Sequence, residues 1–287
     1  MILAHGEVLD AWRWAPHFEV WALVAGLGVA YVFAIRKLGR RFVSPGEPPV
    51  SGARAAAFGL GLASLWIFAD WPLHEISESY LFSVHMTQHL VFSFIAAPLL
   101  LLGTPDWLLR LLLRARWLKA LVGRVTRPVF AMLAFNGFLV FSHWPPFVDL
   151  SVSSAPFHFS AHLSLMLLSF AMWWPVIGPL AEMPRLKPGS RILYLFLQTV
   201  VPTVPASFLT FADTVFYRSY ELAPRLTGLS ALADQRLSGL IMKLGGGMLL
   251  WAVIAVLFFR WSSREDSGIP DSDAWSEVEL AVNQEKT

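Results

Sequence analysis

Long apolar segments alternate with short polar stretches along most of this 287-residue chain. Each apolar segment has about 20 residues, the length that an α-helix needs to cross the hydrocarbon core of a bilayer. None shows the strict alternation of apolar and polar positions that marks the strands of a membrane barrel. The pattern predicts an all-α, polytopic membrane protein with seven transmembrane helices, at roughly residues 17–35, 53–71, 82–102, 128–144, 158–178, 191–211 and 237–259.

Two predicted helices contain irregular places. Pro202 and Pro205 lie in the middle of the sixth segment and should kink or break it, because proline lacks the amide hydrogen that a helix needs. Gly245-Gly246-Gly247 lie in the seventh segment, where small residues let a neighbouring helix approach closely. We interpret both features as packing devices.

The connection between the third and fourth segments is rich in Leu, Trp and Arg and runs from Thr104 to about Val122. Such a composition predicts a helix that lies in the cytoplasmic interface of the membrane. We expect residues 1–262 to form one membrane domain. The polar, acidic residues 263–287 should form a mobile cytoplasmic tail.

The basic residues orient the predicted helices. With seven spans, 17 of the 22 Lys and Arg residues fall in the first, third and fifth loops or after the last helix, all on one side. The positive-inside rule makes that side cytoplasmic, so the N-terminus is outside and the C-terminus is cytoplasmic. The first segment has no basic region before it, so we expect no cleaved signal peptide. The topology accounts for the basic residues, so the net charge of +2 gives no indication of a nucleic-acid partner.

The eight histidines all fall on the opposite, outer side in this topology. Four of them form two i,i+4 pairs, His85/His89 and His158/His162, and each pair shares one face of a helix. His143 lies at the outer end of the fourth segment. The other three are His5, His17 and His74.

Histidine is the commonest metal ligand, and polar side chains in a bilayer are costly without partners. The chain has no cysteine, which excludes disulfides and thiolate ligands. A soft metal would therefore use His and Met. The pattern predicts a metal site with the ligand candidates His85, His89, His143, His158 and His162. Nearby polar or thioether candidates are Met166 on the fifth segment and Asp234, Gln235 and Met242 on the seventh.

Other functions remain open on this pattern. One His from each of two facing helices would suit a b-type haem that carries electrons. A di-iron membrane enzyme fits poorly, because the chain has no adjacent His-His pair. Alternatively, the histidines could organise a dock for another protein without binding metal. A transporter is conceivable from the broken sixth helix, but no acidic residue lies at mid-membrane to couple an ion.

Several motifs follow one another in a fixed order. They are His85-Met86-Thr87-Gln88-His89-Leu90 with Ala97-Pro98 and Gly103-Thr104-Pro105 after it, His143-Trp144-Pro145, the His158/His162 pair with Trp173-Trp174-Pro175, and Ala233-Asp234-Gln235 with Gly239-Leu240-Ile241-Met242. In this combination the chain resembles the CtaG-type cytochrome c oxidase assembly factors. The resemblance covers about residues 17–260.

The resemblance implies a non-enzymatic protein of the bacterial plasma membrane that is required to mature a haem-copper oxidase. It implies copper as the metal and oxidase subunits as the partners. In our interpretation, Met166, Met242 and the acidic residues at the outer ends of the helices would form a relay for the metal. By matching motif, the positions carried over are His85, His89, His143, His158, His162, Asp234, Gln235 and Met242. The chain departs from the pattern at Lys243, where we expect an aromatic residue.

Overall fold

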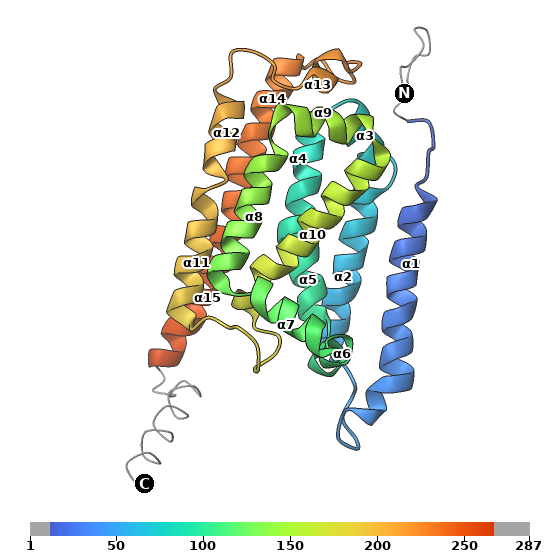
Figure 1. Cartoon of the computed structure of the whole chain (residues 1–287), viewed down its shortest axis with the longest axis vertical. Helices are drawn as coiled ribbons and strands as arrows, with labels where there is room; N and C mark the ends of the chain where they lie inside the picture. Colours follow the sequence, from blue (N-terminus) through green and yellow to red (C-terminus); the bar gives the residue numbers. More distant parts are fainter. Residues whose placement is uncertain (1–11, 267–287) are drawn as a thin grey trace.

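The computed structural model describes residues 12–266, and this part of the chain is helical without any β-strand. The longer helices run side by side along the long axis of the molecule (Figure 1). Short helices close the two ends. His5 and residues 267–287 of the expected tail lie outside the described residues.

Six helical runs in the described residues are long and apolar enough to cross a membrane. A seventh is reached if the bent pair α7 and α8 is one span. The all-α, multi-pass prediction is therefore confirmed, and the number of spans is six or seven. The six runs are Phe18–Arg41, Gly52–Ala69, Phe82–Gly103, Ala155–Ile177, Pro188–Thr210 and Ala231–Ser263.

Several runs contain a local break that divides them into separate elements. The first begins as α1 (Phe18–Phe33), and the second is α2 (Gly52–Ala69). The third comprises α4 (Phe82–Val91) and α5 (Ala97–Gly103), joined by a π-helical turn. The fourth run is α10 (Ala155–Ile177). The last comprises α14 (Ala231–Leu240) and α15 (Gly246–Asp266), again with a π-helical turn between them.

The proline break in the sixth predicted helix is confirmed. Helix α11 (Pro188–Val200) ends just before Pro202, and α12 (Thr203–Thr210) begins just after it. The glycine prediction is confirmed at two of the three positions. A Cβ on Gly245 or Gly246 would come within 3.1 Å of the Leu90 side chain, whereas Gly247 has no close neighbour.

The segment predicted as one interfacial helix forms two helices. These are α6 (Asp106–Leu112) and α7 (Arg116–Val125), which are separated by three residues. Helix α8 (Pro128–Ser142) follows α7 at an angle of 73°. Both short helices lie at the end of the bundle that is lowest in Figure 1.

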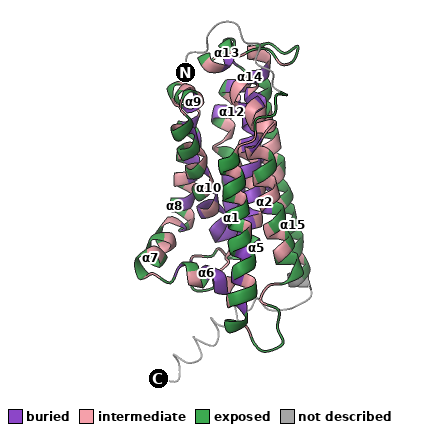
Figure 2. Ribbon diagram, turned by 90° about the vertical axis from the view of Figure 1, so that its right-hand side faces the viewer, coloured by how far each residue is buried: buried purple, intermediate pink, exposed green. Residues whose placement is uncertain are grey.

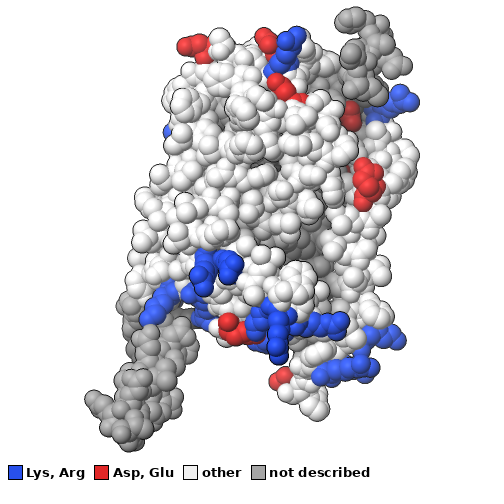
Figure 3. Space-filling model, in the orientation of Figure 1, with Lys and Arg blue, Asp and Glu red and all other residues white. Residues whose placement is uncertain are grey.

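Three further short helices lie at or near the opposite end: α3 (Leu73–Ser79), α9 (Pro145–Ser153) and α13 (Arg218–Leu222). Most Lys and Arg side chains in view gather at the end with α6 and α7 (Figure 3). There Arg110 pairs with Glu182 at 2.9 Å and Arg54 pairs with Asp106 at 2.7 Å. The charges thus distinguish the two ends of the bundle.

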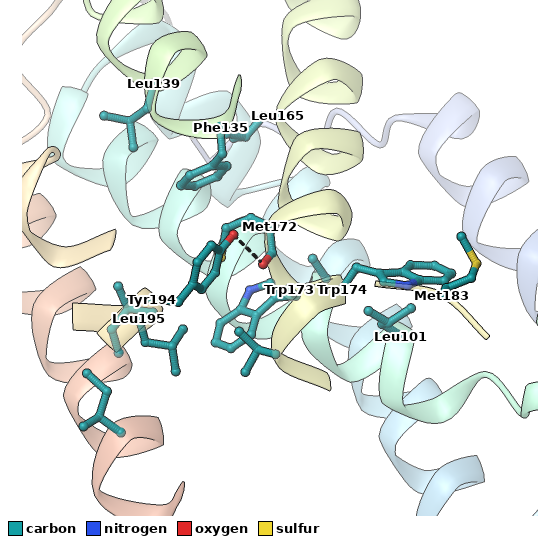
Figure 4. Close-up of a cluster of buried hydrophobic side chains, with 14 of the residues drawn as sticks. Leu101, Phe135, Leu139, Leu165, Met172, Trp173, Trp174, Met183, Tyr194 and Leu195 are labelled. Carbon is teal, nitrogen blue, oxygen red and sulfur yellow. Dashed lines mark hydrogen bonds between the residues drawn. The ribbon is translucent and has the colours of Figure 1, made fainter. Parts of the chain in front are cut away.

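The main hydrophobic core lies between α5, α8, α10, α11 and α15. Figure 4 shows its central side chains, with Met172, Trp173 and Tyr194 packed together. Two buried polar groups there form hydrogen bonds: Trp173 Nε1 donates to Ser93 O at 2.8 Å and Tyr194 OH donates to Met172 O at 3.0 Å. Residues on the outer faces of α1 and α15 are exposed (Figure 2), as expected for helices that face lipid.

Candidate metal centre

Three histidines from two long helices meet near the end of the bundle that carries α3, α9 and α13. His85 and His89 lie one turn apart on α4, and His162 lies on α10. One ring nitrogen of each residue lies within 4.8 Å of the others. The Nε2 atoms of His89 and His162 are 3.2 Å apart. We call these residues the triple-histidine group.

A second group combines two histidines with a carboxylate. His74 and Glu78 lie one turn apart on α3, and His158 lies near the start of α10. Glu78 Oε1 is 2.7 Å from His158 Nε2 and 3.2 Å from His74 Nε2. The three donor atoms again lie within 4.8 Å of one another. We call these residues the histidine–glutamate group.

The two groups are adjacent because α10 contributes to both. The rings of His158 and His162 are 4.1 Å apart, as i,i+4 spacing predicts. The His85 and His158 rings are 6.1 Å apart across the two helices. His17 continues the row toward α1, with its ring 4.5 Å from that of His74. The structure thus arranges six histidines as one connected series.

A small cavity adjoins the triple-histidine group. It has a volume of about 20 Å³ and is lined by all three histidines and by residues of α8, α9 and α10 such as Phe138, Val148 and Ala161. A volume of this size holds about one water molecule. The cavity suits a single small ion or water rather than an organic ligand.

Hydrogen bonds to neighbouring side chains orient the histidines. Ser151 Oγ on α9 lies 3.3 Å from His158 Nδ1, so that Nε2 faces Glu78. Gln88, fully buried on α4, lies 3.2 Å from His74 Nδ1 and also donates to Phe68 O at 2.6 Å. Such partners fix the ring orientation of metal-ligating histidines.

The electrostatics of α3 favour neutral imidazole. Burial lowers the pKa of His74 to about 4, so its ring is uncharged at neutral pH. Burial would raise the pKa of Glu78, but the hydrogen bond with His158 and the electrostatic attraction of the neighbouring histidines outweigh it, and the net shift is downward. A neutral imidazole beside an ionised carboxylate is the donor set that a metal ion requires.

Asp234 and Gln235 hold the local backbone. Both oxygens of the Asp234 carboxylate accept backbone hydrogen bonds at the start of α4, from Phe82 N at 2.7 Å and Ser83 N at 3.2 Å. The carboxylate therefore caps the helix that carries His85 and His89 and complements its dipole. Gln235 accepts from Phe216 N at 2.7 Å and donates to Thr214 O at 3.1 Å.

Tyrosines from the connection after α12 cover the histidines. Tyr220 on α13 is buried, donates to Ser77 O at 2.7 Å and has its ring 6.3 Å from that of His85. Tyr217 donates to His143 O at 3.0 Å. Burial raises the pKa of Tyr220 well above its ordinary value, so it stays a neutral phenol. These side chains tie α13 to α3 and to the end of α8.

Residues 29–264, which include both groups, match the model of the cytochrome c oxidase caa3 assembly factors (Caa3_CtaG). The chain belongs to this family.

Similar curated proteins come from mycobacteria. The chain is 28% identical over 302 residues to uncharacterised proteins of Mycobacterium bovis and Mycobacterium tuberculosis, covering 95% of this chain and 44% of theirs. It is 26% identical over 276 residues to one of Mycobacterium leprae, covering 88% of this chain and 40% of that protein. The chain therefore spans less than half the length of these relatives. No solved structure matches it.

The structure separates the residues that the sequence grouped together. His143 belongs to neither group, and its Nδ1 lies 2.7 Å from Leu139 O, which leaves Nε2 buried without a hydrogen-bond partner. Met242 is buried in the main hydrophobic core, and Met166 packs against that core. His158 lies with His74 and Glu78 rather than in the triple-histidine group.

Sequence reasoning did not select His74 and Glu78 as ligands. Their i,i+4 spacing was a usable signal, because it places both side chains on one face of a short helix. The position of α3 against α10 depends on tertiary packing, which local spacing does not reveal. Gln88 was likewise visible beside His85 and His89, but its contact with His74 required the fold.

Proposed function

We propose that this assembly factor binds copper as cargo at the triple-histidine group and delivers it to a subunit of a haem-copper cytochrome c oxidase. The observation that carries the proposal is the convergence of three imidazole nitrogens within 4.8 Å beside a small cavity. The family supports the link to oxidase assembly. Copper as the ion and the oxidase subunit as the recipient are our assignments.

The donor chemistry suits copper. Imidazole binds copper well, and the chain offers no thiolate to compete for it. Structural sites are usually closed by four protein ligands, whereas a site with three keeps one position open. An open position lets an incoming ligand enter before an outgoing one leaves. A three-histidine site is therefore suited to receiving and releasing an ion.

Two observations support a location of the histidines on the outer side of a bacterial plasma membrane. Most Lys and Arg residues gather at the end with α6 and α7, which the positive-inside rule assigns to the cytoplasm (Figure 3). The histidines lie toward the opposite end, with α3 and α9. We accordingly propose an outer N-terminus, a cytoplasmic C-terminus, and α6 and α7 in the cytoplasmic interface.

The geometry favours copper over a bis-histidine haem. Pockets for organic ligands have volumes of about 300–1,000 Å³. The cavity beside the triple-histidine group has about 20 Å³. The rings of His89 and His162 are 5.0 Å apart and roughly perpendicular. A macrocycle between them would require α4 and α10 to separate.

The experiment measures copper retained by the full chain after purification in detergent, exposure to copper and extensive washing. The variant His89→Ala/His162→Ala should reduce copper affinity by more than about 100-fold, because even the loss of an outer-shell partner costs 10–100-fold. The matched control is Thr87→Ala/Ser164→Ala. It alters the same helices at hydroxyls that bond to the carbonyls of Ser83 and Ser160.

Unchanged copper in the double histidine variant would contradict the site. No retained copper in any form of the protein would contradict the copper proposal and favour a docking role for the histidines. Stoichiometric iron with a haem absorption band would favour the electron-transfer alternative.

A further inference from the structure

We infer that His74, Glu78 and His158 form a second metal site, for a divalent transition-metal ion, which passes copper to the triple-histidine group. The site itself stands on its own geometry, and its role in passing copper rests on the proposed function. The protein thus has two metal sites where the sequence predicted one cluster.

The donor set differs from that of the triple-histidine group. It consists of two imidazoles and one carboxylate. His158 Nε2 lies 2.7 Å and His74 Nε2 lies 3.2 Å from the same oxygen of Glu78. A carboxylate adds a negative charge and a hard oxygen donor, which favour a divalent ion over a monovalent one. Three side chains from two helices, α3 and α10, make up this arrangement.

The ring protons of His74 and His158 can be accounted for when a metal ion binds. In the metal-free state, Gln88 lies against Nδ1 of His74, so the proton of that ring is on Nε2 and is donated to Glu78. An incoming ion takes the place of the Nε2 protons. Each ring stays neutral when its proton is transferred to Nδ1. Ser151 Oγ accepts from His158 Nδ1. For His74, the amide of Gln88 gives up its hydrogen bond to Phe68 O and rotates so that its oxygen accepts from Nδ1.

Within the histidine–glutamate group, exposure decreases from Glu78 to His158. The Glu78 side chain is 29% exposed, that of His74 is 14% exposed and that of His158 is 7% exposed. Glu78 is thus the ligand that an ion meets first from solvent. His89 and His162 lie one turn further along α4 and α10 than His85 and His158. The histidine–glutamate group therefore lies on the solvent side of the triple-histidine group.

His158 and His162, one turn apart on α10, connect the two metal sites. The His158 and His162 rings are 4.1 Å apart, and His162 Nε2 lies 3.2 Å from His89 Nε2. An ion bound by His158 is one helical turn from the next set of nitrogens. The ion can bind a nitrogen of the triple-histidine group before it loses its last bond to the histidine–glutamate group, so it never has to dissociate fully.

The test counts copper(II) ions on the full chain in detergent, added without reductant, by elemental analysis and electron paramagnetic resonance. Wild-type protein should bind two ions with different signals. Glu78→Gln, which keeps the side-chain size, and His74→Ala should each bind one, with the signal of the triple-histidine group remaining. The variant His89→Ala/His162→Ala should also bind one, with the other signal.

The matched control is Glu75→Gln. Glu75 lies on the same short helix, but its carboxylate accepts from Ser79 Oγ at 3.1 Å rather than facing His158. This variant should bind two ions, as wild type does. Far-ultraviolet circular dichroism of every variant checks that the bundle is intact.

The outcomes separate the two proposals. If Glu78→Gln and His74→Ala bind copper as wild type does, the second site is wrong and the triple-histidine site is unaffected. If wild-type protein binds one ion that only the His89/His162 variant loses, the second site is again wrong and Glu78 is a hydrogen-bonded carboxylate. If the His89/His162 variant retains both ions, the proposed function loses its site.

Discussion

The triple-histidine group and the histidine–glutamate group have the same number of donors but different supports. The first is held by α4 and α10, two long helices whose i,i+4 spacing fixes two of its three side chains. The second takes two ligands from α3, a seven-residue helix in a connection. Long helices thus supply rigid positions for the first group, whereas the second depends on how one connecting helix docks.

The difference extends to the residues that support each group. Asp234 caps α4 from another helix and so fixes the rings of the first group through the backbone. Ser151 and Gln88 act directly on rings of the second group. Changes to these supports should therefore affect the two groups separately.

The largest expected effect concerns pH and His74. In the unfolded chain His74 takes up a proton near its ordinary pKa of 6.5, but in the fold only near 4, so the unfolded state binds more protons between these values. The free energy of unfolding is therefore at its full value above pH 6.5, and it decreases by about 3 kcal/mol on account of His74 as pH falls toward 4. Thermal unfolding of metal-free protein across this range measures it.

In His74→Asn this part of the pH dependence should disappear, because the substituted side chain does not titrate. Glu75→Gln should retain the wild-type profile. An unchanged profile in His74→Asn would show that His74 is not held neutral by burial on α3.

A smaller effect is expected at the cap of α4. Asp234→Asn removes the charge and weakens two hydrogen bonds to backbone amides, which should reduce stability by about 2 kcal/mol. Copper affinity should fall severalfold at the triple-histidine group and stay unchanged at the histidine–glutamate group. Thermal unfolding and copper titration of the full chain measure both effects.

Asp213→Asn is the control for this cap. The Asp213 side chain is 98% exposed and lies 3.6 Å from Arg236. It should behave as wild type. Equal loss of copper at both groups in Asp234→Asn would show that the cap supports the whole outer end and does not act through α4 alone.

The smallest effect is expected from Ser151→Ala. It removes the partner of His158 Nδ1, and loss of such a partner costs about tenfold in metal affinity. The loss should appear at the histidine–glutamate group alone. Ser153→Ala is the matched control on the same helix, because its hydroxyl donates to Leu150 O. A tenfold loss at the triple-histidine group instead would place His158 in that group.

The sequence by itself determined the class of fold and the histidine pairs. Helices of about 20 apolar residues, the break at Pro202, and the shared faces of His85/His89 and His158/His162 follow from helix geometry, because each depends on residues at most a few turns apart. The ordered motifs also indicated the family, which the match over residues 29–264 confirms.

Only the tertiary structure decided which side chains meet. Helical spacing places a side chain on a face, but it does not say which face of which neighbour lies opposite. The docking of α3 therefore brought Glu78 to His158, the packing of α4 near α10 brought His89 to His162, and Asp234 reached the start of α4 from a helix about 150 residues away. These contacts join residues far apart in the chain, and their geometry is set by the packing of the whole bundle.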